Sequence, residues 1–190
     1  MSADGGASLS PSVTVSGPGE MIPFFFSNPA IAIDKARHLI YIAYARGVRH
    51  FDAARSYGRA EAFLARWLDT RGPADVCVSS KWGYRYTANW QSTAASHEVK
   101  DLSREHLDAQ WEESRALLGR WLRVFQIHSV TLESGVLRDP RVLERLAELK
   151  ATGVEVGLSV TGARQADVID AALELPVFTW VQATWNVLEP

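Results

Sequence analysis

Four residues that can carry charge or exchange protons follow three apolar stretches in order along the chain. Asp52 and Tyr57 lie in GVRHFDAARSYGRAEAFL, Lys81 lies in VCVSSKWGYRY, and His128 lies in WLRVFQIHSV. If these stretches are strands of an α/β barrel, their carboxyl ends converge on the face that carries the chemistry. A carboxylate, a phenol, an ammonium and an imidazole gathered there would form a proton-transfer site.

Each of these residues also has an ordinary structural interpretation. Asp52 could cap the turn that follows it, and Tyr57 with Gly58 could form a simple aromatic turn. Lys81 could be a surface charge at a strand end, and His128 could be a hydrogen-bonded histidine of the core. The joint placement of the four at strand ends is what favours the chemical interpretation.

Helix and strand signals alternate along most of the sequence. We expect strands in VRHFDAA, VCVSSKW, WLRVFQIHS, VEVGLSV and FTWVQATWNV, with helices between them and a long polar loop over residues 83–103. The first helix should begin at Asn28-Pro29, because Asn is a good N-cap and Pro is favoured at the first helical position. Strands that are apolar on both faces and alternate with helices indicate parallel βαβ units.

The predicted fold is therefore α/β, a partial (β/α)8 barrel. The chain has 190 residues, whereas a closed eight-stranded barrel typically needs ~250 residues. Five strands are clear, one at Val13–Val15 is doubtful, and we expect the last two β/α units to be missing. Residues 1–20 are predicted to be a flexible leader, and residues 21–190 an incomplete barrel domain.

The composition excludes several other classes of protein. It is 47% hydrophobic and 22% charged with a formal net charge of −2, which does not favour nucleic acid or an anionic membrane as a partner. The apolar runs are too short to span a membrane, and the N-terminus lacks the pattern of a secretory signal. Cys77 is the only cysteine, so it forms no internal disulfide. By default we expect a cytoplasmic protein.

Five motifs in order resemble the aldo-keto reductase family. FDAARSYGRAEAFLARWL is similar to F-D-T-A-x-x-Y-G-x-x-E-x-x-L-G, and SSKWG is similar to T-K-x-G. LLGRWLRVFQIHS, LAELKATGVEVGLSV and VQATWNVLEP are similar to the family motifs around the histidine, the G-x-S and the V-Q-x-x-Y-N. The resemblance covers about residues 28–190. The form KWGYRY and the loop after it are most similar to the subgroup that acts on galactose-type sugars.

The resemblance implies an oxidoreductase that uses NADP or NAD. It would interconvert a small carbonyl compound (an aldehyde, ketone or aldose) and the alcohol by hydride transfer. Tyr57 would protonate the carbonyl oxygen, and Lys81 would lower the pKa of that phenol. Asp52 would keep Lys81 charged and in position, and His128 would orient the substrate oxygen.

The resemblance also assigns Ser159 and Gln182 to the cofactor, as residues that hydrogen-bond the nicotinamide carboxamide. The first strand motif of the family is not recognisable, and Trp185 stands where a tyrosine is common. In the family the last two β/α units hold the cofactor phosphates. We therefore expect this chain to be inactive by itself, and to self-associate through the exposed edge of its last strand.

Two other functions stay open at this point. The first is a metal-dependent barrel hydrolase or isomerase with Asp52 and His128 as ligands. It is disfavoured because no second carboxylate or H-x-H pair stands beside them, and because Lys81 would repel a cation. The second is a non-catalytic remnant or interaction module derived from an aldo-keto reductase. Aromatic residues after Lys81, namely Trp82, Tyr84, Tyr86 and Trp90, could wall a substrate pocket or simply pack, and His50 is interpreted as structural.

Overall fold

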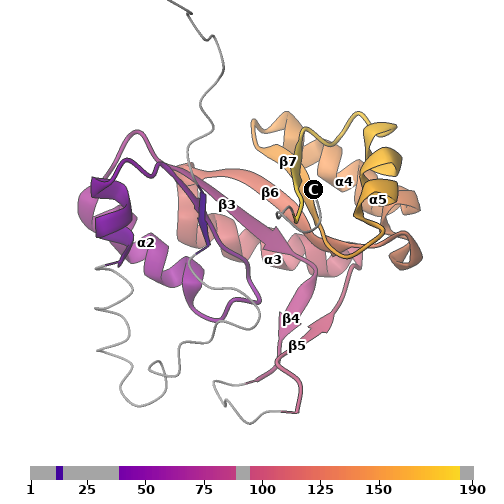
Figure 1. Cartoon of the computed structure of the whole chain (residues 1–190), viewed down its shortest axis with the longest axis horizontal. Helices are drawn as coiled ribbons and strands as arrows, with labels where there is room; N and C mark the ends of the chain where they lie inside the picture. The colour runs from indigo at the N-terminus through magenta and orange to yellow at the C-terminus, as the bar shows by residue number, and fades with distance from the viewer. Residues whose placement is uncertain (1–11, 15–38, 89–94, 185–190) are drawn as a thin grey trace, which may run out of the picture.

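A six-stranded parallel sheet forms the centre of the molecule. The computed structural model describes residues 12–14, 39–88 and 95–184 (Figure 1). The sheet contains β1 (Ser12–Thr14), β2 (His50–Asp52), β3 (Cys77–Trp82), β6 (Leu122–Val130), β7 (Glu155–Val160) and β8 (Trp180–Gln182). Its strand order, β1-β2-β3-β6-β7-β8, follows the chain, and each neighbouring pair is parallel. This curled sheet confirms the predicted partial barrel.

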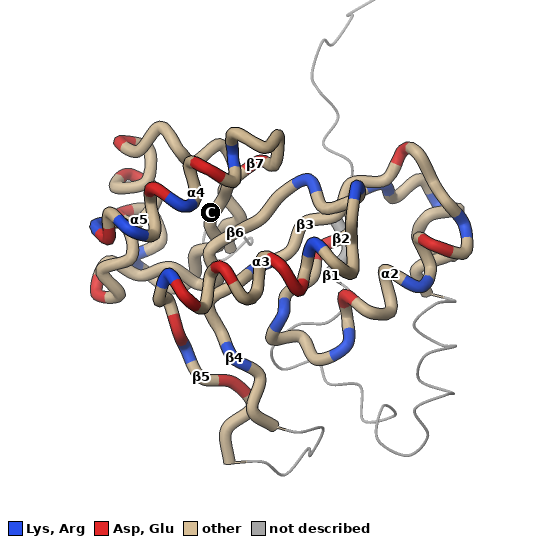
Figure 2. Tube along the Cα trace, turned by 180° about the vertical axis from the view of Figure 1, so that it is seen from behind, with Lys and Arg blue, Asp and Glu red and all other residues tan. Residues whose placement is uncertain are grey.

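Helices connect most of these strands. They are α2 (Ala60–Arg71), α3 (Arg104–Leu118), α4 (Pro140–Ala151) and α5 (Gln165–Leu173). Short 3-10 turns over 119–121, 132–134 and 136–138 complete the connections around β6. Residues 39–45 are also helical, and their predicted beginning at Asn28-Pro29 lies outside the described residues. Acidic and basic residues are mixed along α3, α4 and α5, as Figure 2 shows.

The sequence accounts for where these helices begin and end. Ser103 caps α3 by accepting a hydrogen bond from the backbone N–H of His106 at 3.2 Å. Asp139 caps α4 by accepting from two backbone N–H groups, with Pro140 at the first helical position. Helix α2 ends at Gly72, whose φ of 57° lies in the left-handed region that glycine adopts without strain.

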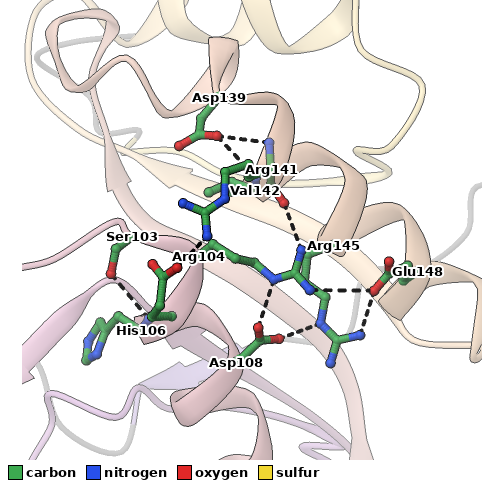
Figure 3. Close-up of polar contacts among 10 residues, drawn as sticks. Ser103, Arg104, His106, Asp108, Asp139, Arg141, Val142, Arg145 and Glu148 are labelled. Carbon is green, nitrogen blue, oxygen red and sulfur yellow. Dashed lines mark hydrogen bonds and ion pairs between the residues drawn. The ribbon is translucent and has the colours of Figure 1, made fainter.

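Helices α3 and α4 are joined by a network of ion pairs at the surface (Figure 3). Asp108 of α3 accepts from Arg104 at 2.8 Å and from Arg145 of α4 at 2.6 Å. Arg145 also reaches Glu148 at 2.8 Å. Pairs this open to solvent typically contribute about 0–1 kcal/mol each, so the network aligns the helices more than it stabilises them.

The loop predicted over residues 83–103 is instead a β-hairpin with its own two strands. Strands β4 (Tyr84–Tyr86) and β5 (Glu98–Lys100) pair antiparallel, with Tyr84 opposite Lys100. Figure 1 shows this hairpin projecting away from the sheet. Strands of only three residues, YRY and EVK, are too short to show an alternation of apolar and polar residues, which explains why the prediction was wrong.

The two edges of the sheet are formed by β1 and by β8. Strand β1 lies inside the segment predicted as a flexible leader, close to the doubtful strand at Val13–Val15. At the other end, β7 and β8 approach closely at Gly157, where an added Cβ would lie 2.7 Å from the Trp180 carbonyl oxygen. The division at residues 20 and 21 stays a prediction.

The core lies between the sheet and the helices. Its largest fully buried side chains include Trp82, Phe51, Phe125, Leu64 and Leu107. Trp82, one of the residues considered for a pocket wall, belongs to this core. Trp90 lies outside the described residues. The sheet is therefore anchored from behind by apolar packing, which leaves the carboxyl ends of the strands to carry polar groups.

Candidate active site

Asp52 and Lys81 form a buried ion pair at the ends of neighbouring strands. The Lys81 Nζ donates to Asp52 Oδ2 and also to the Ala53 carbonyl oxygen at 3.1 Å. Their side chains are 4% and 1% exposed. Burial lowers the pKa of the Lys81 ammonium, and the adjacent Asp52 carboxylate opposes that change.

Tyr57 and His128 meet next to this pair. The Tyr57 hydroxyl oxygen lies 3.4 Å from Nε2 of His128, and the two rings are at 80° with centroids 5.4 Å apart. The Lys81 Nζ lies 5.2 Å from the centroid of the Tyr57 ring. The structure thus brings together the four residues that the sequence placed at strand ends, while their catalytic roles stay predictions.

The acidities of these groups differ in part from expectation. We expected Lys81 to lower the pKa of Tyr57, but that pKa is raised, first by burial and then by Asp52 and Glu98. The ammonium of Lys81 is paired with Asp52, so the phenol meets a nearly neutral pair and not a lone cation. Burial, together with Lys81 and Lys100, lowers the pKa of His128 to about 3. His128 is therefore neutral near pH 7.

Ser159 and Gln182, the predicted cofactor residues, lie opposite each other on β7 and β8. The Ser159 hydroxyl accepts from the backbone N–H of Ser129 at 2.8 Å. Gln182 Nε2 donates to Asp52 Oδ2 at 3.3 Å. Within the described part of the chain, the buried Oε1 of Gln182 has no hydrogen-bond partner. Because a carboxylate only accepts, Asp52 fixes the amide so that this oxygen points elsewhere.

The β4–β5 hairpin places two further residues, Tyr84 and Lys100, beside the candidate site. The Tyr84 ring lies 4.9 Å from the His128 ring, at 77°. The Lys100 Nζ donates to the carbonyl oxygen of Ser129 and lies 5.0 Å from the Tyr84 ring centroid. Tyr84 was one of the aromatic residues considered for a pocket wall, whereas Lys100 was missed because the hairpin was missed.

A second carboxylate is buried on the opposite face of β3. Glu61 is 1% exposed and accepts hydrogen bonds from Ser80 at 2.5 Å and Ser114 at 2.6 Å. It also pairs with Arg55 at 2.5 Å. Arg55 continues outward to the exposed Glu113 at 2.8 Å. Glu61 belongs to the motif that carries Tyr57, so the spacing Y-G-x-x-E was the signal that could have identified it.

Across residues 39–88 and 95–184, no group of three or more His, Cys, Asp or Glu side chains is placed to hold a metal ion. In the same part of the chain, no helix is long and apolar enough to cross a membrane.

Comparison with known proteins identifies the family. Residues 25–190 match the model of the aldo/keto reductase family. This chain belongs to that family. No curated protein sequence matches the chain. Aldo-keto reductases use NADH or NADPH, which agrees with the cofactor that the motifs implied.

Solved structures show the same fold. A Pseudomonas aeruginosa protein assigned as an aldo-keto reductase superposes with a TM-score of 0.65 at 24% identity, over 82% of this chain and 57% of its own. Glycerol dehydrogenase from Gluconobacter oxydans gives a TM-score of 0.65 at 20% identity, over 82% of this chain and 46% of its own. A mutant of Gox0644 in complex with NADPH gives 0.51 at 21% identity, over 76% and 47%. The chain thus spans about half the length of these aldo-keto reductase folds.

Proposed function

We propose that this chain acts in an NAD(P)-dependent oxidoreductase that interconverts a carbonyl compound and an alcohol. Tyr57, His128, Lys81 and Asp52 would be its proton-transfer residues. One observation carries the proposal: the Tyr57 hydroxyl and the His128 imidazole meet 3.4 Å apart beside a buried Lys81–Asp52 pair. Family membership supports the reaction class, and the geometry supports these residues.

The residues beside this site fit a nicotinamide. A buried amide oxygen without a donor is costly, and Gln182 Oε1 has none among the residues that the structure describes. A carboxamide N–H would satisfy it. Ser159 stands opposite on β7 with a hydroxyl that can donate while it accepts from Ser129. The NADPH bound to the structurally similar Gox0644 mutant supports the same cofactor class here.

The bound nicotinamide would supply a hydride to the carbonyl carbon. His128, neutral near pH 7, would hold the carbonyl oxygen through Nε2 and so set its direction. Tyr57, whose raised pKa keeps its proton, would donate that proton to the oxygen. An alkoxide is a much stronger base than a phenolate, so the transfer stays favourable. These protonation states favour the direction of carbonyl reduction.

Lys81 and Asp52 would act on the phenolate that remains. The Lys81 ammonium, 5.2 Å from the centroid of the Tyr57 ring, would offset the repulsion between the phenolate and Asp52, and Asp52 would hold Lys81 in place and charged despite burial. Tyr84 and Lys100 stand next to His128, where they would contact the rest of the substrate. An aromatic face beside a cation suits a polar, hydroxylated carbonyl compound such as an aldose, which is the substrate class we propose.

The test combines binding and turnover in the 190-residue chain. NADPH and NADH are titrated by fluorescence, and reduction of aldehydes, ketones and aldoses is followed by absorbance. We expect Gln182→Leu to weaken cofactor binding and Tyr57→Phe to abolish any turnover without affecting binding. Tyr41→Phe, a substitution on a surface helix, is the matched control and should change neither.

The outcomes separate the proposal from its alternative. Binding without turnover would agree with the expected inactivity of the chain by itself and would keep the site assignment. A folded chain that binds neither cofactor would favour the non-catalytic interaction module. The chain covers 57% of the Pseudomonas aeruginosa protein and 46% of the glycerol dehydrogenase, so both functions are proposals for this chain.

A further inference from the structure

A chain of hydrogen bonds leads from the ion pair to a histidine that the proposed reaction does not use. Ser79 Oγ donates to Asp52 Oδ1 at 2.5 Å. His50 Nε2 lies 2.9 Å from the same Ser79 oxygen. Ser79 is 1% exposed, and His50 is half-buried. His50 lies on β2 two residues before Asp52, and Ser79 lies on β3 two residues before Lys81. Residues two apart on a strand share a face, so all four lie on the same face of the sheet.

The chemistry of these groups fixes the direction of each bond. A carboxylate paired with an ammonium only accepts, so the single hydroxyl hydrogen of Ser79 goes to Asp52. Ser79 can then only accept from His50. His50 must therefore carry its hydrogen on Nε2. Burial lowers the pKa of His50, which keeps the ring neutral near pH 7 and makes this a choice of tautomer.

The consequence is that both oxygens of Asp52 are fixed. Oδ2 accepts from Lys81 and from Gln182, while Oδ1 accepts from Ser79. Without Ser79, the carboxylate could rotate about its terminal torsion, which is a soft one. The rotation would carry Lys81 with it, because that ammonium is bonded to the carboxylate.

His50 is in turn held from the far side of the site. Its ring packs edge-on against Trp180, with centroids 5.3 Å apart at 65°. Trp180 belongs to β8, two residues before Gln182. The chain of contacts therefore connects the strand of the proposed acid–base pair to the strand of the proposed cofactor amide.

We propose that Ser79 and His50 are positioning residues that fix the Asp52 carboxylate and, through it, the Lys81 ammonium. The kinetic part of this proposal rests on the proposed function, whereas its structural part does not. Ser80 provides the internal control, because it is the next residue and bonds a different buried carboxylate, Glu61, on the opposite face.

The first experiment needs no turnover. In protein with 15N-labelled histidine, NMR should show His50 as the Nε2–H tautomer in the wild type and should show loss of that form in Ser79→Ala. In protein with 13C-labelled lysine, the four signals of Lys35, Lys81, Lys100 and Lys150 are titrated. We expect Ser79→Ala to raise the Lys81 midpoint by about 0.5 pH unit or more, because a carboxylate with one donor fewer attracts the ammonium more strongly.

The second experiment uses the reductase assay. Ser79→Ala should lower kcat about tenfold with the KM for cofactor unchanged, since small misplacements of acid–base groups act on the chemical step. Ser79→Thr keeps the hydroxyl and should restore kcat. His50→Gln keeps an N–H donor, so we expect its kcat to be higher than that of His50→Leu. Ser80→Ala should leave kcat within about twofold and the Lys81 midpoint unchanged.

Three results would overturn the proposal: an Nδ1–H tautomer of His50, equal effects of the two serine variants on Lys81, or no rescue by threonine. If the wild type turns over no carbonyl compound and binds no cofactor, the proposed function is wrong, but the positioning role of Ser79 and His50 is not thereby contradicted. The tautomer and the Lys81 titration still decide whether Ser79 and His50 fix the pair.

Discussion

The two faces of β3 each bury a carboxylate, and they differ in what surrounds it. On one face Asp52 accepts from Ser79 and pairs with Lys81. On the other, Glu61 accepts from Ser80 and pairs with Arg55. Adjacent serines on one strand thus serve opposite faces, as the alternation of a strand requires.

The difference lies in the neighbours of each pair. Glu61 is surrounded by donors that saturate it, and Arg55 leads to an exposed glutamate at the surface. Asp52 stands beside a phenol and a neutral imidazole, and beside the buried Gln182 oxygen that has no partner among the described residues. Burial of a charge pair is therefore no sign of chemistry by itself. Adjacent acid–base groups, and a buried acceptor with no partner among the described residues, mark the face of Asp52 as the proposed reactive face.

The sharpest test of this comparison removes the cation from the reactive face. Lys81→Met should lower turnover by about 10²- to 10⁴-fold, because the phenolate left by Tyr57 would then face the Asp52 carboxylate with no cation to offset it. It should also destabilise the fold, since Asp52 stays buried without its partner. Steady-state kinetics and urea unfolding measure the two effects. Turnover equal to the wild type would contradict the assignment of Lys81.

Removing the cation from the other face should affect stability and spare the chemistry. Arg55→Met leaves Glu61 buried without its ion pair, and we expect a loss of about 3 kcal/mol in the free energy of unfolding. The kcat should stay within about threefold of the wild type at a temperature where the variant is folded. A loss of kcat as large as that of Lys81→Met would show that the two faces are not functionally separate.

The neutral imidazole of the reactive face makes the fold sensitive to acid. Folded His128 has a pKa of about 3 against an ordinary value near 6.5, so between these pH values only the unfolded chain binds the proton. The stabilisation is full above about pH 6.5 and falls by up to about 1.4 kcal/mol per pH unit below it. Urea unfolding between pH 7 and pH 4 gives the free energy of unfolding at each pH. We expect that free energy to fall less steeply with decreasing pH in His128→Asn than in the wild type. Identical slopes would mean that His128 is not buried as a neutral ring.

The smallest effect is expected where charges meet water. Asp108→Ala removes the carboxylate shared by Arg104 and Arg145 (Figure 3), and we expect a loss of about 0.5–1 kcal/mol that shrinks in 0.5 M salt. Thermal unfolding at two salt concentrations measures it. A loss as large as that of Arg55→Met would contradict the idea that burial separates these networks.

Much of this comparison could be predicted from the sequence. Polar residues at the ends of apolar runs identified Asp52, Lys81 and His128, because parallel strands bring their carboxyl ends together. The caps at Ser103 and Asp139 depend on local chemistry alone, because each side chain bonds to backbone N–H groups within three residues of it.

What the sequence could not provide depends on contacts between distant segments. The hairpin that brings Lys100 to His128 has strands too short and too polar to show a period. The pKa of Tyr57 was predicted in the wrong direction, because the sequence does not show that the phenol is buried and lies near Asp52 and Glu98. The tie between Ser79 and Asp52 joins two strands and is not visible in either alone.

The close approach of β7 and β8 at Gly157 has a consequence for how this protein can vary. Any side chain there would meet the backbone of Trp180, which has no freedom to turn aside. The strand would have to move as a body, and Gln182 two residues later would move with it. The absence of a side chain at Gly157 thus permits the present spacing of β7 and β8, on which the position of the Gln182 amide relative to Asp52 depends. If Gln182 holds the cofactor as we propose, mutation at Gly157, which is not one of the proposed site residues, would weaken cofactor binding by displacing β8.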